Sequence, residues 1–344
     1  MNWKNLTAVL VVIAGDLHLF AQRPLLPLPV ESIRSQIFSA ESPAASCVRL
    51  FPKQIPSGAQ EKLKILLKSI KEQDAIELSQ LFHPRLKMTP SKIGQALIQM
   101  KLGLKGPLEV SMHRFWALQN VENSIQSLSC PYTTEVSLYP QYGYPLMFGV
   151  WIQILGQEDL GRVFVTFVPH HDRWVLGGFH YMRWSYHGLS YEHLLQRGEQ
   201  RRLVGDTFGA RMWFDLSGKY LSGAGLYELP IQKEIFQFRD QVLPENEWKF
   251  EVQKLLPGHK VKHIASLFTV DGFGLLIRTQ IVHKPSDSLT EQCQGIIKSL
   301  QKSNPVWWGG ISGVRCSFVM AGENFLQEGR LGYIYLPTRQ KNPL

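Results

Sequence analysis

The 344-residue sequence lacks most of the signals that would identify an enzyme. It contains no GxSxG, HExxH or Walker A motif, and no GxGxxG that follows a strand. Its four cysteines form no CxxC pair, so the ligand spacing of a structural zinc site is absent as well. We therefore expect neither a metal nor an organic cofactor. The sequence predicts architecture better than chemistry.

Charged residues are also scarce, at 19% of the chain, whereas hydrophobic residues reach 44%, which is typical of a folded globular protein. Basic residues nevertheless outnumber acidic ones and give a formal net charge of +9. They are scattered, and the densest cluster is only Arg197, Arg201 and Arg202. Because nucleic-acid binders concentrate basic residues on one face or helix, this pattern favours a solvated basic surface over specific nucleic-acid binding.

The N-terminal apolar run, 6–14, is too short to span a bilayer, and we expect no transmembrane segment. A positively charged start precedes this run, and Ala21 offers a small residue near a possible cleavage point. This order is typical of a signal peptide, although Asp16 and His18 oppose insertion. We expect 1–21 to direct export to the periplasm or out of the cell. The alternative is a cytoplasmic protein in which this segment is an ordinary buried helix or strand.

Export would allow disulfides to form, because they persist in oxidising compartments. The four cysteines are Cys47, Cys130, Cys293 and Cys316, which allow three pairings, and the last two are the closest in sequence. One or two disulfides are therefore expected if the chain is exported. The alternative is four buried thiols that behave as small hydrophobic side chains.

The region 57–187 is predicted to fold as helices followed by an antiparallel sheet. The preceding segment, 22–56, is rich in proline and serine and should form an irregular leader. Hydrophobic spacing predicts helices over 57–71, 74–83 and 90–102, with Asp74 as the N-cap of the second. Strands are expected over 108–120, 125–139, 145–155, 162–169 and 173–184. The last three are joined by short turns and must be antiparallel neighbours.

Three helices, with an aspartate opening the second, followed by a curved antiparallel sheet resemble the nuclear transport factor 2-like (NTF2-like) superfamily. The segments that carry the resemblance are 63–70, Lys71-Glu72-Gln73-Asp74, Leu81-Phe82-His83-Pro84, 164–167 and 172–176. The resemblance implies an α+β fold in which the helices pack into the concave face of a bent sheet and form a cone. It also implies that enzymatic members usually place an Asp/His pair in the cavity. Here, however, Asp74 belongs to a helix start and Asp172 to a turn.

Histidines and tryptophans of the sheet form the main candidate ligand-binding site. If inward positions of the sheet line the cone, the candidates are His113, Trp116, Trp151, His180 and Trp184. His113 or His180 could act there as an acid, a base or a hydrogen-bond donor. The alternative is that these side chains are the polar edges of a well-filled core.

Three further features of the sequence are possible sites. His170-His171-Asp172 contains possible metal ligands, but a tight turn exposes side chains to water, and we expect a solvated hairpin turn. His83 could face the cavity mouth or bond a carbonyl at the end of a helix. Trp307 and Trp308 lie beside glycines and could bind a partner, because tryptophan is enriched at binding hot spots. They could equally cover the end of a second core.

From residue 190 the periodicity changes, and we expect a second α+β domain over 190–337, followed by a frayed tail at 338–344. Its helices are expected over 191–219, 230–243 and 287–302, the last capped by Ser286 or Asp287. Its strands are expected over 248–255, 260–270, 273–283, 314–321 and 330–336.

These patterns favour an exported, non-catalytic protein. Its first domain is expected to bind a small apolar or amphipathic ligand, or a protein partner, through aromatic-rich sheet surfaces. Two alternatives stay open. One is an NTF2-like cavity enzyme that uses a histidine as acid or base, and the other is a structural component of the cell envelope.

Overall fold

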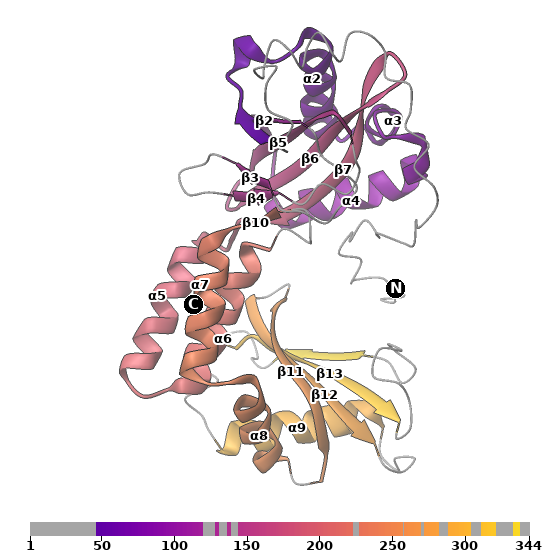
Figure 1. Cartoon of the computed structure of the whole chain (residues 1–344). Helices are drawn as coiled ribbons and strands as arrows, with labels where there is room; N and C mark the ends of the chain where they lie inside the picture. Colours follow the sequence, from indigo (N-terminus) through magenta and orange to yellow (C-terminus); the bar gives the residue numbers. More distant parts are fainter. Residues whose placement is uncertain are drawn as a thin grey trace. The chain divides into compact units, whose positions relative to one another are not determined.

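In the computed structural model, the chain divides into two compact units that both contain helices and strands (Figure 1). The first unit comprises Met1–Gly188 and Tyr220–Pro230, and the second comprises Leu189–Lys219 and Ile231–Leu344. The structure describes residues 46–119, 128–130, 136–138, 144–222, 227–256, 258–269, 272–281, 288–303, 311–320 and 333–337. The expected signal peptide (1–21), the tail 338–344, and Trp307 and Trp308 lie outside these residues. The sequence pattern places 220–230 in the second domain, whereas this segment belongs to the first unit.

Three α-helices of the first unit lie against one face of its larger sheet. They are α2 (Ser57–Glu72), α3 (Ala75–Gln80) and α4 (Pro90–Leu104). The carboxylate of Asp74 accepts a hydrogen bond from the backbone N–H of Glu77 at 2.9 Å and so caps α3. Pro90 stands at the start of α4, where the missing N–H has no helical partner in any case. The three expected helices and the Asp74 cap are confirmed.

The larger sheet of the first unit is antiparallel and has five strands. They are β1 (Ser46–Arg49), β2 (Glu109–Gln119), β5 (Leu146–Leu155), β6 (Leu160–His170) and β7 (Arg173–Arg183). Their order is β1-β2-β5-β6-β7, so the expected meander of the last three is confirmed. The end of the proline-rich leader, expected to be irregular, supplies β1 and a short 3-10 helix, Pro52–Gln54. A second short 3-10 helix is Pro84–Leu86, and β8 is Ser185–Tyr186.

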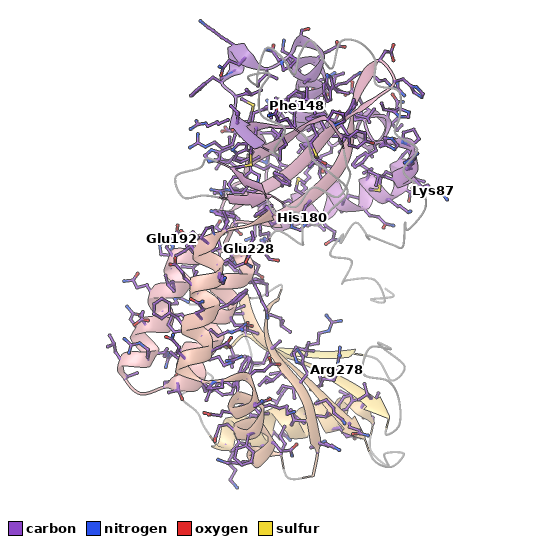
Figure 2. All side chains as sticks on the ribbon, in the orientation of Figure 1. Lys87, Phe148, His180, Glu192, Glu228 and Arg278 are labelled. Carbon is purple, nitrogen blue, oxygen red and sulfur yellow. A yellow bond between two sulfur atoms is a disulfide. The ribbon has the colours of Figure 1, made fainter. Side chains whose placement is uncertain are left out.

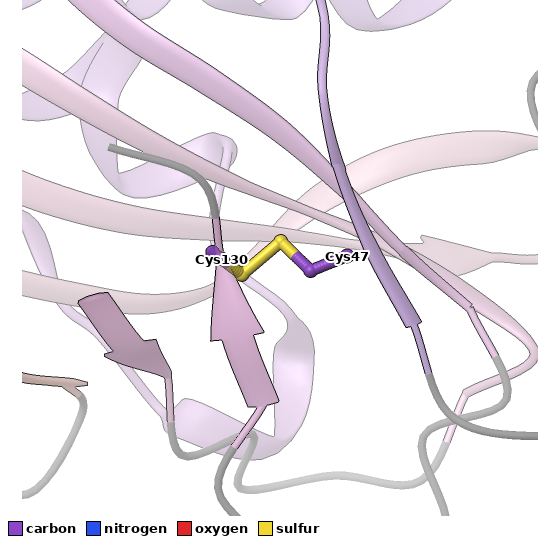
Figure 3. Close-up of a disulfide and its surroundings, with 2 residues drawn as sticks. All are labelled: Cys47 and Cys130. Atoms are coloured by element: carbon purple, nitrogen blue, oxygen red, sulfur yellow. A yellow bond between two sulfur atoms is a disulfide. The ribbon is translucent and has the colours of Figure 1, made fainter. Parts of the chain in front are cut away.

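A smaller, three-stranded sheet completes the first unit. It contains β3 (Leu128–Cys130), β4 (Val136–Leu138) and β10 (Tyr227–Glu228), in the order β10-β4-β3. The single strand expected over 125–139 is therefore wrong, because β3 and β4 are separate antiparallel strands. A disulfide between Cys47 and Cys130 joins β1 of the larger sheet to β3 of the smaller one (Figure 3).

The main core of the first unit lies between the larger sheet and its helices. Alternate side chains of each strand point to this face, with a one-residue break in β2 and another in β7. Phe148 and Val150 of β5 are fully buried there, in one cluster with Leu66 of α2 and Leu97 of α4 (Phe148 is labelled in Figure 2). Large apolar side chains thus fill the space between the sheet and the helices.

The second unit contains five α-helices among its described residues. They are α5 (Tyr191–Leu203), α6 (Thr207–Tyr220), α7 (Pro230–Val242), α8 (Glu245–Leu255) and α9 (Leu289–Ser303), where α6 and α7 each share one terminal residue with the first unit. The strand expected over 248–255 is wrong, since this segment is α8. Its sequence alternates like a strand, but Trp248 and Val252, which are four residues apart and both buried, also fit one face of a helix. Ser288 caps α9 through a reciprocal pair of hydrogen bonds with Glu291, instead of the expected Ser286 or Asp287.

Four described strands of the second unit form one sheet, and the short β9 (Leu189–Ser190), which precedes them in the chain, is not part of it. They are β11 (Lys260–Thr269), β12 (Gly272–Ile281), β13 (Gly313–Met320) and β14 (Tyr333–Pro337), in this order. The expected hairpin of β11 and β12 is confirmed, whereas β12 and β13 run parallel. A second disulfide, Cys293–Cys316, joins α9 to β13, so no cysteine is a free thiol. Two disulfides are typical of proteins from an oxidising compartment. Within the described part of the chain, no helix has the length and apolar character needed to cross a membrane.

Candidate functional site

The five candidate residues of the first unit belong to the face of the larger sheet that points away from α2, α3 and α4. Trp151 alternates with Val150 and Ile152, and both neighbours belong to the core beneath the helices. His180 alternates in the same way with Phe179 and Tyr181. Successive side chains of a strand point to opposite faces, so the tryptophan and the histidine must face away from the helices.

Trp116 follows the same rule, because it stands between two residues of the helix-facing core, Phe115 and Ala117. We call this opposite side the outer face. It is defined by His113, Arg114, Trp116, Trp151, Arg162, Phe164, His180, Met182 and Trp184. The structure therefore brings the five predicted residues to one face, but not to the helix-lined cavity that the family resemblance implied.

Strand register places the aromatic residues of the outer face in a row. Trp151 of β5 lies directly opposite Phe164 of β6, which in turn lies opposite His180 of β7. Trp116 of β2 meets the Trp151 ring edge-on, with 5.3 Å between the ring centroids. Such edge-to-face contacts add to the free energy gained by burial. Trp116 and Trp151 are at most 1% exposed, so both are packing residues in this state.

Arg162 contacts two tryptophans of the outer face, Trp184 and Trp151. Its guanidinium carbon lies 3.5 Å from the ring centroid of Trp184 and 5.4 Å from that of Trp151. A guanidinium over an indole face is attracted by the ring quadrupole, most strongly where water is excluded. Arg162 was not predicted as a site residue. The available signal was its place two residues before Phe164, which puts both side chains on the same face of β6.

His113 lies at a break in the register between Met112 and Arg114, where β2 carries one extra residue. Burial lowers the pKa of His113, and the guanidinium groups of Arg162, Arg114 and Arg49 lower it further. The imidazole is therefore neutral at pH 7, and the three guanidinium groups that favour its neutral form lie at this end of the outer face. A concentration of basic groups here contrasts with their scattered distribution along the sequence.

His180 is the most buried polar group of the outer face, with 7% of the residue exposed. Burial lowers its pKa, and a backbone hydrogen bond with Ser222 opposes that effect. Its Nε2 atom is buried and finds no hydrogen-bond partner among the described residues. No carboxylate contributes to the pKa shift of His180. Among the described residues, His180 is therefore not part of an Asp/His acid–base pair.

Tyr227 of β10 covers the centre of the outer face. Its ring centroid lies 5.2 Å from that of Trp151 and 5.3 Å from that of Phe164. Its hydroxyl donates a hydrogen bond to the Sδ atom of Met182 at 2.5 Å. Tyr227 was not predicted as a site residue, because it comes from a segment distant in sequence and no local pattern links it to the sheet.

The His170-His171-Asp172 turn joins β6 and β7 as expected. The rings of His170 and His171 lie 4.3 Å apart, and His83 packs against His170 with 4.6 Å between the ring centroids. Within the described residues, no group of three or more histidine, cysteine, aspartate or glutamate side chains is arranged to hold a metal ion.

His83 does not bond a carbonyl at the end of α3. Its Nδ1 atom instead accepts a hydrogen bond from the backbone N–H of Arg85 at 3.1 Å, which caps the 3-10 helix. Burial, followed by the charges of His170, Arg85 and His171, lowers the pKa of His83 to about 4. His83 thus stays neutral in the folded protein at pH values where an unfolded histidine is protonated.

This difference predicts an acid-sensitive first unit. Between about pH 6.5 and about pH 4 the unfolded chain binds a proton that folded His83 excludes, so the free energy of unfolding should fall by about 1–3 kcal/mol. Asparagine can accept the Arg85 hydrogen bond but does not titrate, so His83→Asn should remove most of this loss. Urea denaturation at several pH values measures the effect.

The matched control is His171→Asn, at an exposed position of the same cluster, which makes the smallest contribution to the lowered pKa of His83 and should leave most of the wild-type pH dependence in place. Equal acid sensitivity in His83→Asn and in the wild type would show that His83 does not cause it.

Comparisons of the chain with protein-family models, with curated proteins and with solved structures find no match. The NTF2-like family therefore stays a prediction from the sequence pattern. What the structure shows is the coarser arrangement of three helices against one face of a five-stranded antiparallel sheet. Function has to be inferred from the chemistry of the outer face.

Proposed function

We propose that the chain is an exported, non-catalytic binding protein whose NTF2-like first unit binds a small amphipathic ligand at the outer face. The observation that carries this proposal is the stacking of Arg162 between Trp184 and Trp151. A guanidinium on an indole face supplies the positive charge and planar geometry that suit a carboxylate or phosphate head, and the aromatic rings supply an apolar surface beside it.

The grouping of charge supports an anionic head. Arg162, Arg114 and Arg49 lie close enough to His113 to lower its pKa, so like charges share one end of the sheet. Like charges repel, and a carboxylate or phosphate placed among them reduces that repulsion. The other side of the sheet has no comparable feature, because Phe148, Val150 and their neighbours fill it with apolar side chains.

The alternative of a cavity enzyme receives less support. His113 and His180 lie away from the helices, and no carboxylate contributes to the pKa shift of His180. Export is supported by the two disulfides, since disulfides persist in oxidising compartments.

Isothermal titration with decanoate, and with uncharged decanol as the matched probe, tests the proposal. We expect decanoate to bind more tightly than decanol, and Arg162→Gln to weaken decanoate binding by about tenfold or more, as the loss of a hydrogen bond to a charged group implies. Arg173→Gln, at an exposed position at the start of β7, is the control and should bind like the wild type.

Two outcomes would contradict the proposal. One is the absence of binding to either probe, and the other is equal decanoate affinity in the wild type and Arg162→Gln.

A further inference from the structure

We propose that the turn between α5 and α6 of the second unit is a contact site for an anionic phospholipid membrane. Leu203 and Val204 enter the membrane–water interface, and the arginines beside them pair with lipid phosphates. The turn belongs to a different unit from the outer face, so the inference does not depend on the proposed ligand. It gives a role to the densest basic cluster of the sequence, which is Arg197, Arg201 and Arg202.

Two adjacent aliphatic side chains are exposed at this turn, and we call Leu203 and Val204 the aliphatic pair. Leu203 is 74% exposed and Val204 is 75% exposed, the highest values among the exposed large hydrophobic residues that the structure describes. Single exposed hydrophobic residues are common, whereas two neighbours at one turn present a continuous apolar surface to water. Transfer of that surface into a membrane interface is favourable in proportion to the apolar area removed from water.

The turn stands at one end of an antiparallel helical hairpin (Figure 1). Near the other end, the Ser217 hydroxyl of α6 donates a hydrogen bond to the carbonyl of Tyr191, the first residue of α5, at 2.8 Å. A Cβ atom at Gly198 of α5 would lie 2.6 Å from the ring of Phe214 of α6, so the two helices are in close contact. Residues 202–205, where the hairpin turns, are all exposed. The aliphatic pair therefore projects from the end of the hairpin.

Backbone hydrogen bonds fix the conformation of this turn. The N–H of Gly205 donates to the carbonyl of Arg202 at 3.0 Å. The N–H of Asp206 donates to the carbonyl of Arg201, also at 3.0 Å, which completes a Schellman motif. Gly205 has a φ of +80°, a value that glycine adopts without strain. An ordered turn presents the aliphatic pair without the entropic cost of ordering a loop on binding.

The charges around the turn favour an anionic surface. Arg197 and Arg202 are exposed, and the carboxylates nearest to them in sequence already have basic partners. Asp206 pairs with Arg201 at 3.5 Å, and its side chain is only 6% exposed. Glu199 pairs with Arg202 at 2.9 Å, but both side chains are nearly half exposed. Because exposed ion pairs contribute little to stability, a lipid phosphate can take the place of Glu199 beside the guanidinium.

The small size of the apolar surface favours a membrane over a protein partner. A stable protein interface buries about 800 Å² on each partner, which two side chains do not supply. Membrane contact has no such requirement, because the insertion of a few apolar groups and the attraction of nearby arginines to anionic head groups add to one another.

Sedimentation of the full-length protein with sucrose-loaded vesicles tests the inference. The wild type should bind vesicles that contain about one third phosphatidylglycerol, and should bind pure phosphatidylcholine vesicles weakly. Replacing the aliphatic pair, with Leu203→Gln and Val204→Gln together, removes apolar surface without changing the charge and should weaken binding about tenfold or more. Arg202→Gln should weaken binding by about fivefold, and added salt should weaken binding of the wild type.

The matched control replaces two exposed aliphatic residues of α4 in the first unit, with Ile98→Gln and Leu102→Gln together. These residues are 56% and 68% exposed, and their replacement should leave vesicle binding unchanged. A second readout uses the fact that no cysteine of the chain is a free thiol. A polarity-sensitive dye on Val204→Cys should report a less polar environment when the anionic vesicles are added, whereas the same dye on Leu102→Cys should report no change.

Several results would overturn the inference. One is equal binding of the wild type to both kinds of vesicle or to neither, and another is an equal loss of binding in the α4 control. Dimers that form in the wild type but not in the variant of the aliphatic pair, without vesicle binding, would show that the turn is an interface between two copies of the chain. If circular dichroism shows that this variant does not fold, the dye decides, and unchanged emission from Val204→Cys would overturn the inference.

Discussion

Replacing Cys47 and Cys130 with serine is expected to lower the free energy of unfolding of the first unit by about 4–5 kcal/mol. The disulfide closes a loop with a sequence separation of 83 residues, which contains all three helices and β2. A cross-link of this kind acts chiefly on the unfolded chain, whose conformational freedom it restricts, and the restriction grows with loop length. It also fixes the smaller sheet, and with it β10, to the edge of the larger one.

The second disulfide supplies a matched comparison in the same molecule. Cys293 and Cys316 are separated by 23 residues, so their replacement by serine should cost about 3 kcal/mol and act on the second unit. Urea denaturation followed by hydrogen exchange of peptides from each unit measures both effects. A loss below about 1 kcal/mol in the Cys47 and Cys130 variant would contradict the loop argument.

Local patterns predicted those parts of the fold that local chemistry determines. The turns around the meander, the Asp74 cap and Pro90 at the start of α4 each depend on a few neighbouring residues, and each is found as expected. The prediction for 248–255 was wrong because the conformation of this segment depends on residues that are distant in sequence. Its alternation fits a strand, whereas burial of Trp248 and Val252 against the second core selects a helix, and that core is formed by distant residues.

The positions of the candidate residues were only partly predictable. Four of them lie in strands of the larger sheet and Trp184 directly follows β7, but the sequence pattern did not predict which side of the sheet they face. Seven consecutive residues of β5, from Leu146 to Ile152, are buried, because both faces of this strand are covered. A strand buried on both faces shows a continuous hydrophobic run, so its sequence does not reveal which side chains meet the helices. Tyr227 escaped detection because its contact with Trp151 joins positions far apart in the chain.

The largest effect of a single substitution is expected at Asp159, just before β6. Asp159 is 4% exposed. Its carboxylate accepts four hydrogen bonds from the last residue of β7 and from residues that follow this strand. The donors are the guanidinium of Arg183 at 3.1 Å, the hydroxyl of Ser185 at 3.0 Å, and the backbone N–H groups of His187 at 3.1 Å and Gly188 at 3.0 Å. Asp159→Ala takes the shared buried acceptor away from these donors, of which the Ser185 hydroxyl is buried and the Arg183 guanidinium keeps only the carbonyl of Gly103. We expect a loss of about 3–5 kcal/mol in the free energy of unfolding.

The preceding residue is the control. Glu158 forms an ion pair with Lys105 at 2.5 Å, but both side chains are nearly half exposed, so Glu158→Ala should cost less than about 1 kcal/mol. Asp159→Asn should fall between the two, since an amide oxygen accepts fewer hydrogen bonds than a carboxylate. Urea denaturation of the three variants tests the order, and equal stability of Asp159→Ala and Glu158→Ala would contradict it.

Asp159 also affects the outer face, through its ion pair with Arg183. Arg183 lies between Met182 and Trp184, both residues of that face, and its guanidinium is held by Asp159 and by the carbonyl of Gly103 at the end of α4. Freeing Arg183 should loosen the end of β7 and with it the Trp184 ring on which Arg162 stacks. We therefore expect Asp159→Asn to weaken decanoate binding even under conditions where the variant is fully folded, whereas Glu158→Ala should not.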